Sequence, residues 1–385
     1  MRENVLVSIV SDQTLPNILI IKELEQINFK LFIFISTEEM ERRGKTDTIV
    51  STSKIDSRRV KVVKVDQDNY LEILNKLNSI EEIKDKNIFY YLNITCGTKP
   101  MSITLLDFYR DYENKIVIYI PVGKNYYIDF YSGKKIDISY RVTVEEYLSS
   151  YNIKIENKKK IPQHIDCLND RKEMTYKLWD FALNNIDKVN EIIKNLRDTY
   201  KNNRNKISRD EIKDIAGELL NLINLDLESE SHDRVKNWYN YFTGGWFEEL
   251  VYLRTRDILG VKENDHIVIG IQIVKGGVKN ELDVVVCLEN RLYYIECKTG
   301  LGEKQNDVFK ETFEKLARMK DQKQFGLSMR NYLLTLDKKV LYDVNGDLQK
   351  EERESTYGIK FYGLKEIEEA GLDGIIKEIF GIKGD

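Results

Sequence analysis

Five short runs of apolar residues near the N-terminus most restrict what this chain can fold into. Each run is apolar almost throughout, and stretches with helical spacing separate the runs. Strands that are buried on both faces are typical of parallel sheets covered by helices on both sides. We therefore expect a doubly wound, Rossmann-like α/β domain, with strands at residues 5–10, 31–35, 60–65, 88–92 and 116–120.

Two polar loops follow the first and fourth expected strands, and a doubly wound sheet binds its ligands at such strand ends. The loops are Ser11–Asn17 and Asn93–Met101. The second loop places hydroxyl groups, Gly97 and Lys99 before a helix N-terminus, where free N–H groups favour an anion. It would serve equally as a polar turn whose threonines cap the helix. A G-x-G-x-x-G motif does not follow the first strand, which disfavours an ordinary dinucleotide dehydrogenase.

The pattern changes after Pro121. Residues 126–130 and 135–138 alternate across a Ser-Gly turn, which predicts a β-hairpin, and residues 157–162 form a lysine-rich linker. Residues 170–227 have helical spacing, with a capping box at Ser208–Glu211. Basic residues in this segment form either a solvated bundle surface or a flank that guides nucleic acid: Arg197, Lys201, Arg204, Lys206, Arg209 and Lys213.

The stretch Glu281–Thr299 predicts two apolar strands joined by a tight turn at Glu289-Asn290. Glu296 and Lys298 are two residues apart, so they project from the same face of the second strand. Asp283 lies near the start of the first strand, at the same end of the hairpin. Two interpretations are open: Lys298 forms a salt bridge at the sheet end, or the two carboxylates bind Mg²⁺ or Mn²⁺.

The composition excludes several classes of protein. A length of 385 residues suggests two or three domains, and a net charge of −4 means that any nucleic-acid contact needs a local basic surface. Three separated histidines and four scattered cysteines fit no zinc or disulfide pattern, which disfavours a zinc hydrolase or a histidine-based nuclease. No apolar run approaches a membrane span and the N-terminus lacks a signal-peptide pattern, so we expect no membrane association and a cytoplasmic location.

The C-terminal region resembles the PD-(D/E)xK nucleases. The resemblance rests on Asp283, then Glu296 and Lys298, preceded by a helix with the acidic pair Glu248-Glu249. The family implies that the acids bind Mn²⁺ or Mg²⁺ and that the lysine positions the attacking water. Glu249 is the alternative to Glu248 as the helix acid. The implied catalytic residues are Glu248, Asp283, Glu296 and Lys298, and the implied metal ligands are Glu248, Asp283, Glu296 and the backbone carbonyl of Cys297.

The N-terminal region resembles the CARF domain, the Rossmann-like sensor of CRISPR-associated proteins. The resemblance rests on the Ser11–Asn17 loop and on TCGTKPM, residues 95–101, which is similar to the family's TGGTK-type signature with Cys96 at a usual glycine. It implies a pocket in which ligand phosphates meet Thr98 and Lys99. The implied ligand-binding residues are Ser11, Asp12, Gln13, Asn17, Thr95, Cys96, Gly97, Thr98, Lys99 and Met101.

Together the two regions resemble the cyclic-oligoadenylate-activated CARF nucleases of type III CRISPR systems. This implies a homodimer, cyclic tetra-adenylate as the activator, and cleavage of DNA, single-stranded or supercoiled, with RNA as a further candidate substrate. We expect a CARF-like domain at residues 1–156, a helical connector at 157–235 and a restriction-endonuclease-like α/β domain at 236–385. A ligand-regulated transcription factor, with a winged helix within residues 170–227, is the alternative. Degradation of the activator by the CARF pocket also stays open.

Overall fold

The computed structural model describes residues 3–300, 305–321, 325–327, 329–337, 354 and 358–382. The chain divides into two compact units. The first contains residues 1–154 together with two short later segments, 287–292 and 323–328; the second contains 155–286, 293–322 and 329–385. The domain bounds expected at residues 156 and 235 stay a prediction. The division into two units does not separate the expected helical connector from the C-terminal region, and it adds these two short segments to the first unit.

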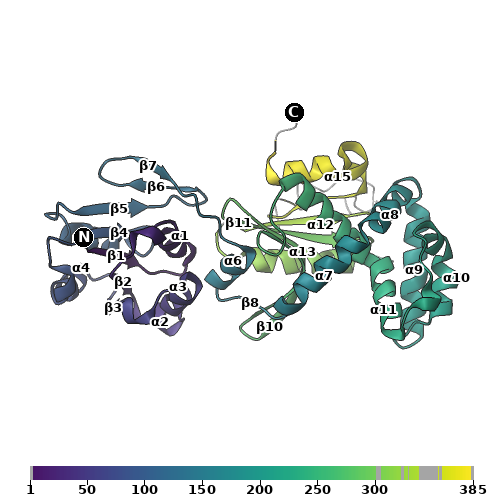
Figure 1. The fold of residues 1–385 in the computed structure, drawn as a ribbon, viewed down its shortest axis with the longest axis horizontal. Coiled ribbons are helices and arrows are strands. Elements are labelled where there is room, and N and C mark those ends of the chain that lie inside the picture. Colours follow the sequence, from purple (N-terminus) through teal and green to yellow (C-terminus); the bar gives the residue numbers. More distant parts are fainter. Residues whose placement is uncertain are drawn as a thin grey trace. The chain divides into compact units, whose positions relative to one another are not determined.

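The first unit contains the expected mostly parallel sheet, with the strand order β3-β2-β1-β4-β5-β6-β7. Strands β1 to β5 are parallel, and β5, β6 and β7 pair antiparallel, which confirms the predicted hairpin. Figure 1 shows this sheet in purple and blue. The strands are β1 Asn4–Ile9, β2 Leu31–Ser36, β3 Val60–Lys64, β4 Phe89–Asn93, β5 Lys115–Tyr119, β6 Tyr126–Asp129 and β7 Lys135–Asp137.

Helices connect these strands, and the apolar side chains between helices and sheet form the core of the unit. One helix expected over residues 38–50 is in fact two, because Gly44 takes a left-handed conformation, with φ +64°, between them. The helices are α1 Leu15–Glu23, α2 Glu38–Arg42, α3 Lys45–Ser53, α4 Tyr70–Asn78, α5 Lys99–Phe108 and α6 Val144–Ser150.

The second unit begins with helices: α7 Ile161–Asp170, α8 Lys172–Asn184, α9 Ile186–Asn202, α10 Arg209–Leu222 and α11 His232–Asn240. The predicted capping box is present, with the Ser208 hydroxyl accepting from the Glu211 amide. Residues 161–240, all of which the structure describes, contain no strand, so they supply no wing for a winged helix.

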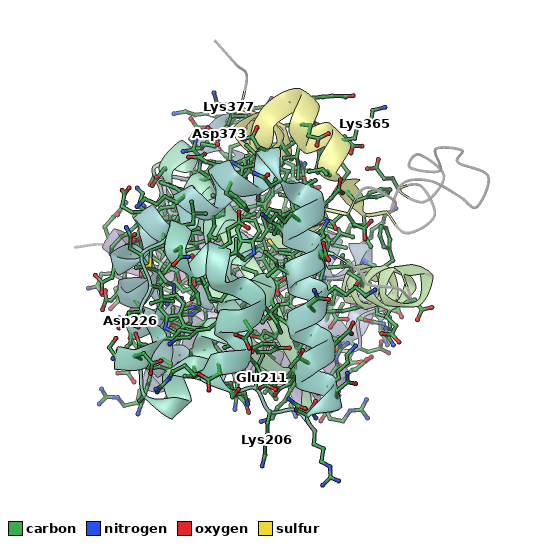
Figure 2. All side chains as sticks on the ribbon, turned by 90° about the vertical axis from the view of Figure 1, so that its right-hand side faces the viewer. Lys206, Glu211, Asp226, Lys365, Asp373 and Lys377 are labelled. Atoms are coloured by element: carbon green, nitrogen blue, oxygen red, sulfur yellow. The ribbon has the colours of Figure 1, made fainter. Side chains whose placement is uncertain are left out.

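The basic residues of this segment do not form one continuous surface. Arg197 is half-buried, and Arg209 and Lys213 both pair with Glu228. Lys206 is exposed, and Figure 2 shows it pointing away from the helices. A flank that guides nucleic acid would therefore have to use the exposed Lys201, Arg204 and Lys206.

A second sheet follows, with the strand order β13-β12-β11-β10-β9-β8. Its strands are β8 Lys154–Ile155, β9 Ile267–Lys275, β10 Val278–Leu288, β11 Arg291–Lys298, β12 Arg330–Thr335 and β13 Lys360–Tyr362. The accompanying helices are α12 Trp246–Leu259, α13 Gln305–Asp321 and α15 Leu364–Phe380. Helix α12 packs against α15 and α8 (Figure 1). Arg254 of α12 pairs with Asp373 of α15, and Asp373 is labelled in Figure 2. Among the described helices, none is long and apolar enough to cross a membrane.

Candidate ligand cavity and nuclease site

A cavity of about 420 Å³ lies in the first unit, at the carboxyl ends of β1 and β4. The strand order reverses between these two strands, which is where doubly wound sheets bind ligands. The cavity is lined by both predicted polar loops, by the loop after β5 and by two segments from far along the chain. Its walls include Ser11, Asp12, Gln13, Thr95, Cys96, Gly97, Thr98, Met101, Val122, Lys124, Asn125, Tyr151, Glu289, Asn290 and Leu327.

Two of the predicted ligand residues do not line this cavity. Asn17 is completely buried, where its side chain bonds Ser8 and accepts from Asn93 Nδ2 at 3.0 Å. It ties α1 to the ends of β1 and β4. Lys99 is exposed at the first residue of α5. The polar loops were therefore correctly located, but Asn17 serves the core beneath the cavity and Lys99 lies outside its lining.

Gly97 and Cys96 fix the conformation of the second loop. Gly97 has φ +83°, and a Cβ atom there would come within 2.3 Å of Ile9 Cγ2, so only glycine fits without rearrangement. The buried thiol of Cys96 donates to the Gln13 carbonyl at 3.2 Å, and burial raises its pKa to about 11. Cys96 therefore joins the two polar loops as a neutral thiol.

The threonine hydroxyls of the second loop are engaged within the protein. Thr98 Oγ1 donates to the Gln67 carbonyl at 2.6 Å and does not cap α5. Thr95 Oγ1 donates to Asn93 Oδ1 at 2.6 Å and accepts from the Ile120 amide at 3.0 Å. The first-turn N–H groups of α5 are thus left for another acceptor.

Sequence reasoning missed the cations beside the first loop. Asp12 pairs with Arg43 at 2.6 Å and with Lys45 at 3.3 Å. Burial opposes ionisation of Asp12, but Arg43 and Lys45 outweigh it and lower the pKa of the carboxyl. The loop is thereby fastened to α2 and α3, and the only signal was a pair of basic residues in an otherwise polar helix.

The predicted catalytic hairpin is present in the second sheet. Strands β10 and β11 meet at Glu289-Asn290, whose φ values of 50° and 57° identify a tight two-residue turn. Strand β10 starts earlier than expected, so Asp283 lies in the middle of it and not near its start. Opposite Asp283, Gly270 of β9 has φ +60° and packs against His164, so this kink also requires glycine. Asp283 Oδ2 accepts from the Cys297 amide at 2.8 Å.

Glu296 lies at the centre of a charged cluster formed with Asp283, Lys298 and Lys315. Its Oε1 lies 2.6 Å from Lys298 Nζ, and its Oε2 lies 2.8 Å from Lys315 Nζ. Lys298 Nζ is also 3.7 Å from Asp283 Oδ2. The Tyr294 hydroxyl donates to Glu296 Oε2 as well. The hairpin therefore brings Asp283, Glu296 and Lys298 together as predicted, while Lys315 of α13 is an addition that the sequence did not reveal.

The acidic pair at the start of α12 separates into two environments. Glu249 is buried and forms an ion pair with Arg171, which lies between α7 and α8. The Arg171 Nε atom is 2.8 Å from Glu249 Oε2. Glu248 instead interacts electrostatically with Asp283, Lys298, Glu281 and Glu296, which are the charges of the cluster. Geometry therefore favours Glu248 as the helix acid and gives Glu249 a structural role.

Burial and mutual repulsion raise the pKa values of two of these carboxyls. Burial and then Asp283 raise the pKa of Glu248 to about 8, and burial and then Glu296 raise that of Asp283 to about 6. Burial also opposes ionisation of Glu296, but Lys298 and Lys315 lower its pKa. Burial acts against the charged form of Lys298, yet Asp283 and Glu296 raise its pKa, so it stays protonated.

The donor chemistry of this cluster suits a hard divalent cation, because carboxylates that repel one another gain by sharing one. Within the described ranges, no three carboxylate, imidazole or thiol groups are arranged around one point as ligands. Lys298 Nζ instead lies between Asp283 and Glu296, where it partly offsets their charge. The residue types fit a hard divalent cation, which would take over the charge compensation that Lys298 now provides.

The end of β11 is anchored by a residue that sequence reasoning placed on a surface. Arg197 of α9 donates to the Thr243 carbonyl at 2.6 Å, to the Gly300 carbonyl at 3.2 Å and to the Thr299 hydroxyl at 3.3 Å. Thr299 follows Lys298 directly. The helical connector therefore holds the chain just beyond the charged cluster.

Comparison with protein families finds a matching family model for the N-terminal region and another for the C-terminal region. Residues 5–147 match the model of the Card1 CARF domain, and residues 235–367 match that of the Card1-like endonuclease domain. The chain belongs to the Card1-like CARF endonucleases. No curated protein sequence matches this chain.

Solved structures share the fold of this Card1-like chain. Can2 from Sulfobacillus thermosulfidooxidans, in complex with cyclic tetra-adenylate, is 21% identical with a TM-score of 0.67, over 98% of this chain and 99% of its own. Protein VC1899 from Vibrio cholerae is 16% identical with a TM-score of 0.71, over 99% of both chains. A type III CRISPR defence DNA nuclease activated by cyclic oligoadenylate is 14% identical with a TM-score of 0.53, over 87% of this chain and 45% of its own.

Proposed function

We propose that this Card1-like protein is a metal-dependent endonuclease that a cyclic oligoadenylate, most simply the tetra-adenylate, activates as part of type III CRISPR defence. The observation that carries the proposal is the pairing in one chain of a cavity at the reversal point of a CARF sheet with an Asp283–Glu296–Lys298 cluster in an endonuclease domain. The cyclic tetra-adenylate bound to Can2 supports the choice of activator, and the type III CRISPR DNA nuclease activated by cyclic oligoadenylate supports the choice of DNA as substrate.

In the sensor, the N-terminus of α5 and the backbone of the Thr95–Thr98 loop suit the phosphates of such a ring. Lys124 adds a positive charge to the lining. A two-fold symmetric ring is matched by a homodimer that presents this cavity twice, which is the assembly we propose. The engaged hydroxyls of Thr95 and Thr98 favour binding of the ring over its degradation.

In the nuclease, Asp283, Glu296 and Glu248 would hold Mn²⁺ or Mg²⁺, with the Cys297 carbonyl as a further candidate ligand. The cation would lower the pKa of a bound water and offset charge on the scissile phosphate. Lys298 stays protonated, so it donates a hydrogen bond to the attacking water or to a phosphate oxygen and does not act as the base. Glu249 takes no part, because Arg171 holds it.

The test is a cleavage assay on supercoiled plasmid, single-stranded DNA and RNA in parallel. Each is incubated with Mn²⁺ or Mg²⁺, with and without cyclic tetra-adenylate, and with EDTA as the metal-free control. We expect ring-dependent and metal-dependent cutting of DNA that Lys298→Ala abolishes without weakening ring binding. Ring binding with no cutting of any substrate would contradict the proposal and favour a ligand-regulated nucleic-acid-binding protein.

A further inference from the structure

The turn of the catalytic hairpin is built into the wall of the ligand cavity. Glu289 and Asn290 line the cavity, and the segment Cys287–Leu292 belongs to the first unit. The rest of β10 and β11, with Asp283 and Glu296, belongs to the second unit. The same pair of strands therefore supplies part of the sensor at its turn and the charged cluster farther along.

Asn290 is fixed in the first unit by every polar atom of its side chain. Its Oδ1 accepts from the Val142 amide at 2.9 Å, and its Nδ2 donates to the Tyr140 carbonyl and to Asn125 Oδ1, each at 3.0 Å. Asn290 is buried, with 6% of its surface exposed. A buried amide satisfied in this way resists displacement, because each lost partner leaves an unpaired polar group.

The residues on either side hold the loop after β5, which is the wall of the cavity around Val122 and Lys124. Glu289 accepts from Asn125 Nδ2 and pairs with Arg141 at 2.8 Å. Arg291 donates to the Gly123 carbonyl, and its guanidinium packs against that glycine. A ligand that moves this loop must therefore move the hairpin turn or break these bonds.

A second segment from far along the chain, residues 325–327, also belongs to the first unit and contributes to the wall of the cavity. Phe325, Gly326 and Leu327 belong to the first unit, although α13, with Lys315, precedes them in the second. The Phe325 carbonyl accepts from the Tyr147 hydroxyl at 2.9 Å, and Leu327 lines the cavity. Gly326, with φ +85°, lies against the Tyr151 ring, and a Cβ there would come within 2.2 Å of the hydroxyl oxygen.

We propose that the turn Glu289–Arg291 forms a recognition wall for the cyclic oligonucleotide and passes ligand binding along β10 and β11 to the nuclease site. This proposal deepens the proposed function and rests on it. Strands β10 and β11 are hydrogen-bonded neighbours and continue from the turn to Asp283 and Glu296, so the covalent and hydrogen-bonded path from the turn to the charged cluster is short. Ligand binding can bias the site only through such differential contacts.

The test uses Asn290→Gly, because glycine keeps the positive φ of the turn while it removes all three side-chain bonds. Asn152→Gly is the matched control, since Asn152 is also an asparagine with positive φ in the first unit but is exposed. We expect Asn290→Gly to cut DNA at least tenfold more slowly at saturating cyclic tetra-adenylate, and Asn152→Gly to match the wild type. Equal rates for Asn290→Gly and wild type would overturn the proposal.

Hydrogen exchange gives a second readout that does not depend on cutting. Addition of cyclic tetra-adenylate to the wild-type protein should slow amide exchange in the peptide covering residues 287–292. Unchanged exchange there, with ring binding proved by calorimetry, would also overturn the recognition wall. If the wild type binds no ring or cuts nothing, the proposed function itself fails, and that result is distinct from a failure of Asn290→Gly alone.

A different observation assigns a role to Lys315. Its Nζ donates to Glu296 Oε2 at 2.8 Å, to the Tyr294 hydroxyl at 3.2 Å and to the Glu281 carbonyl at 3.1 Å. Lys315 reaches the cluster from α13, on the opposite carboxylate oxygen from Lys298. It therefore fixes the rotation of the Glu296 carboxylate.

We infer that Lys315 is a positioning residue that turns Glu296 Oε1 toward a catalytic cation; this too rests on the proposed function. Partners that orient a ligand carboxylate in this way change metal affinity by about 10–100-fold when removed. A lysine that contributed only its charge would repel the cation, so its removal would tighten metal binding. The two roles thus predict opposite signs for one measurement.

The measurement is calorimetric Mn²⁺ binding to Lys315→Met, Lys315→Arg and the wild type. We expect Lys315→Met to bind Mn²⁺ about 10–100-fold more weakly and Lys315→Arg to stay near the wild type. Arg318→Ala is the control on the same helix, because Arg318 is exposed and donates to the Glu314 carbonyl of its own helix. Tighter or unchanged binding in Lys315→Met, or equal weakening in Arg318→Ala, would overturn the inference. If the wild type itself binds no Mn²⁺, that result would instead count against the proposed metal site.

Discussion

The ion pair between Arg171 and Glu249 offers a decisive way to tell a structural acid from a catalytic one. Glu249 has 4% of its side chain exposed and accepts two hydrogen bonds from the Arg171 guanidinium. Arg171→Met would leave this buried carboxylate without its ion-pair partner. Breaking a buried pair from one side destabilises a protein by about 3–5 kcal/mol. For a domain of this size, that lowers the melting temperature by about 6–20 °C.

The pH dependence of this loss has a definite sign. Burial already raises the pKa of Glu249 even though Arg171 acts against the shift. Loss of Arg171 raises that pKa further. An acid whose pKa is raised by folding stabilises the fold at low pH and loses that contribution as the pH rises. The melting deficit of Arg171→Met should therefore be small near pH 5 and largest above pH 8.

Scanning calorimetry of the full chain across this pH range would measure the effect. The double variant Arg171→Met, Glu249→Gln should recover most of the lost stability, because a neutral amide replaces the unpaired charge. Glu248→Gln, one residue away, should melt like the wild type or higher and lose cutting. A shift of less than about 2 °C for Arg171→Met, or no recovery in the double variant, would refute the structural role of Glu249.

Three further predictions concern the sensor loop, the charged cluster and the anchor of β11. Gly97→Ala should destabilise the first unit by about 1–3 kcal/mol and weaken ring binding, measured by calorimetry against Gly133→Ala, whose Cβ meets nothing within 4 Å. Because the pKa of Glu248 is raised to about 8, the melting temperature without metal should fall as the pH rises from about 4.5 to 8, and Glu248→Gln should flatten this fall. Arg197→Met should cost about 1.5–3 kcal/mol and speed amide exchange around Thr299, as hydrogen-exchange mass spectrometry would show.

The sequence predicted the elements whose signal is local. Apolar runs located β1 and β2, because a strand buried on both faces needs no partner to be recognised. The turn at Glu289-Asn290 and the same-face pair Glu296 and Lys298 follow from strand periodicity alone. The capping box at Ser208 was equally local. These features account for the correct fold class and for the core of the candidate nuclease site.

The features that were missed depend on contacts between distant residues. Lys315 looks like any lysine on a polar helix until folding brings it to Glu296. The resemblance to the CARF domain placed Asn17 among the ligand-binding residues, yet Asn17 is buried against Ser8 and Asn93. Arg197 was grouped with surface cations, although its partners lie more than forty residues away in sequence. Spacing along a chain carries no information about such partners.

The assignment of Glu289 to Arg291 to the first unit has a consequence for how proteins of this architecture can be recombined. A sensor taken as one continuous piece ending near Lys154 would arrive without the turn and without Phe325–Leu327. The Val142 amide would lose its bond to Asn290, and the Tyr147 hydroxyl would lose its bond to the Phe325 carbonyl. A nuclease domain taken alone would carry two orphaned pieces of the sensor. Exchange of ligand specificity between relatives therefore has to transplant three separate stretches of chain together, and a single crossover would yield a sensor with an incomplete wall.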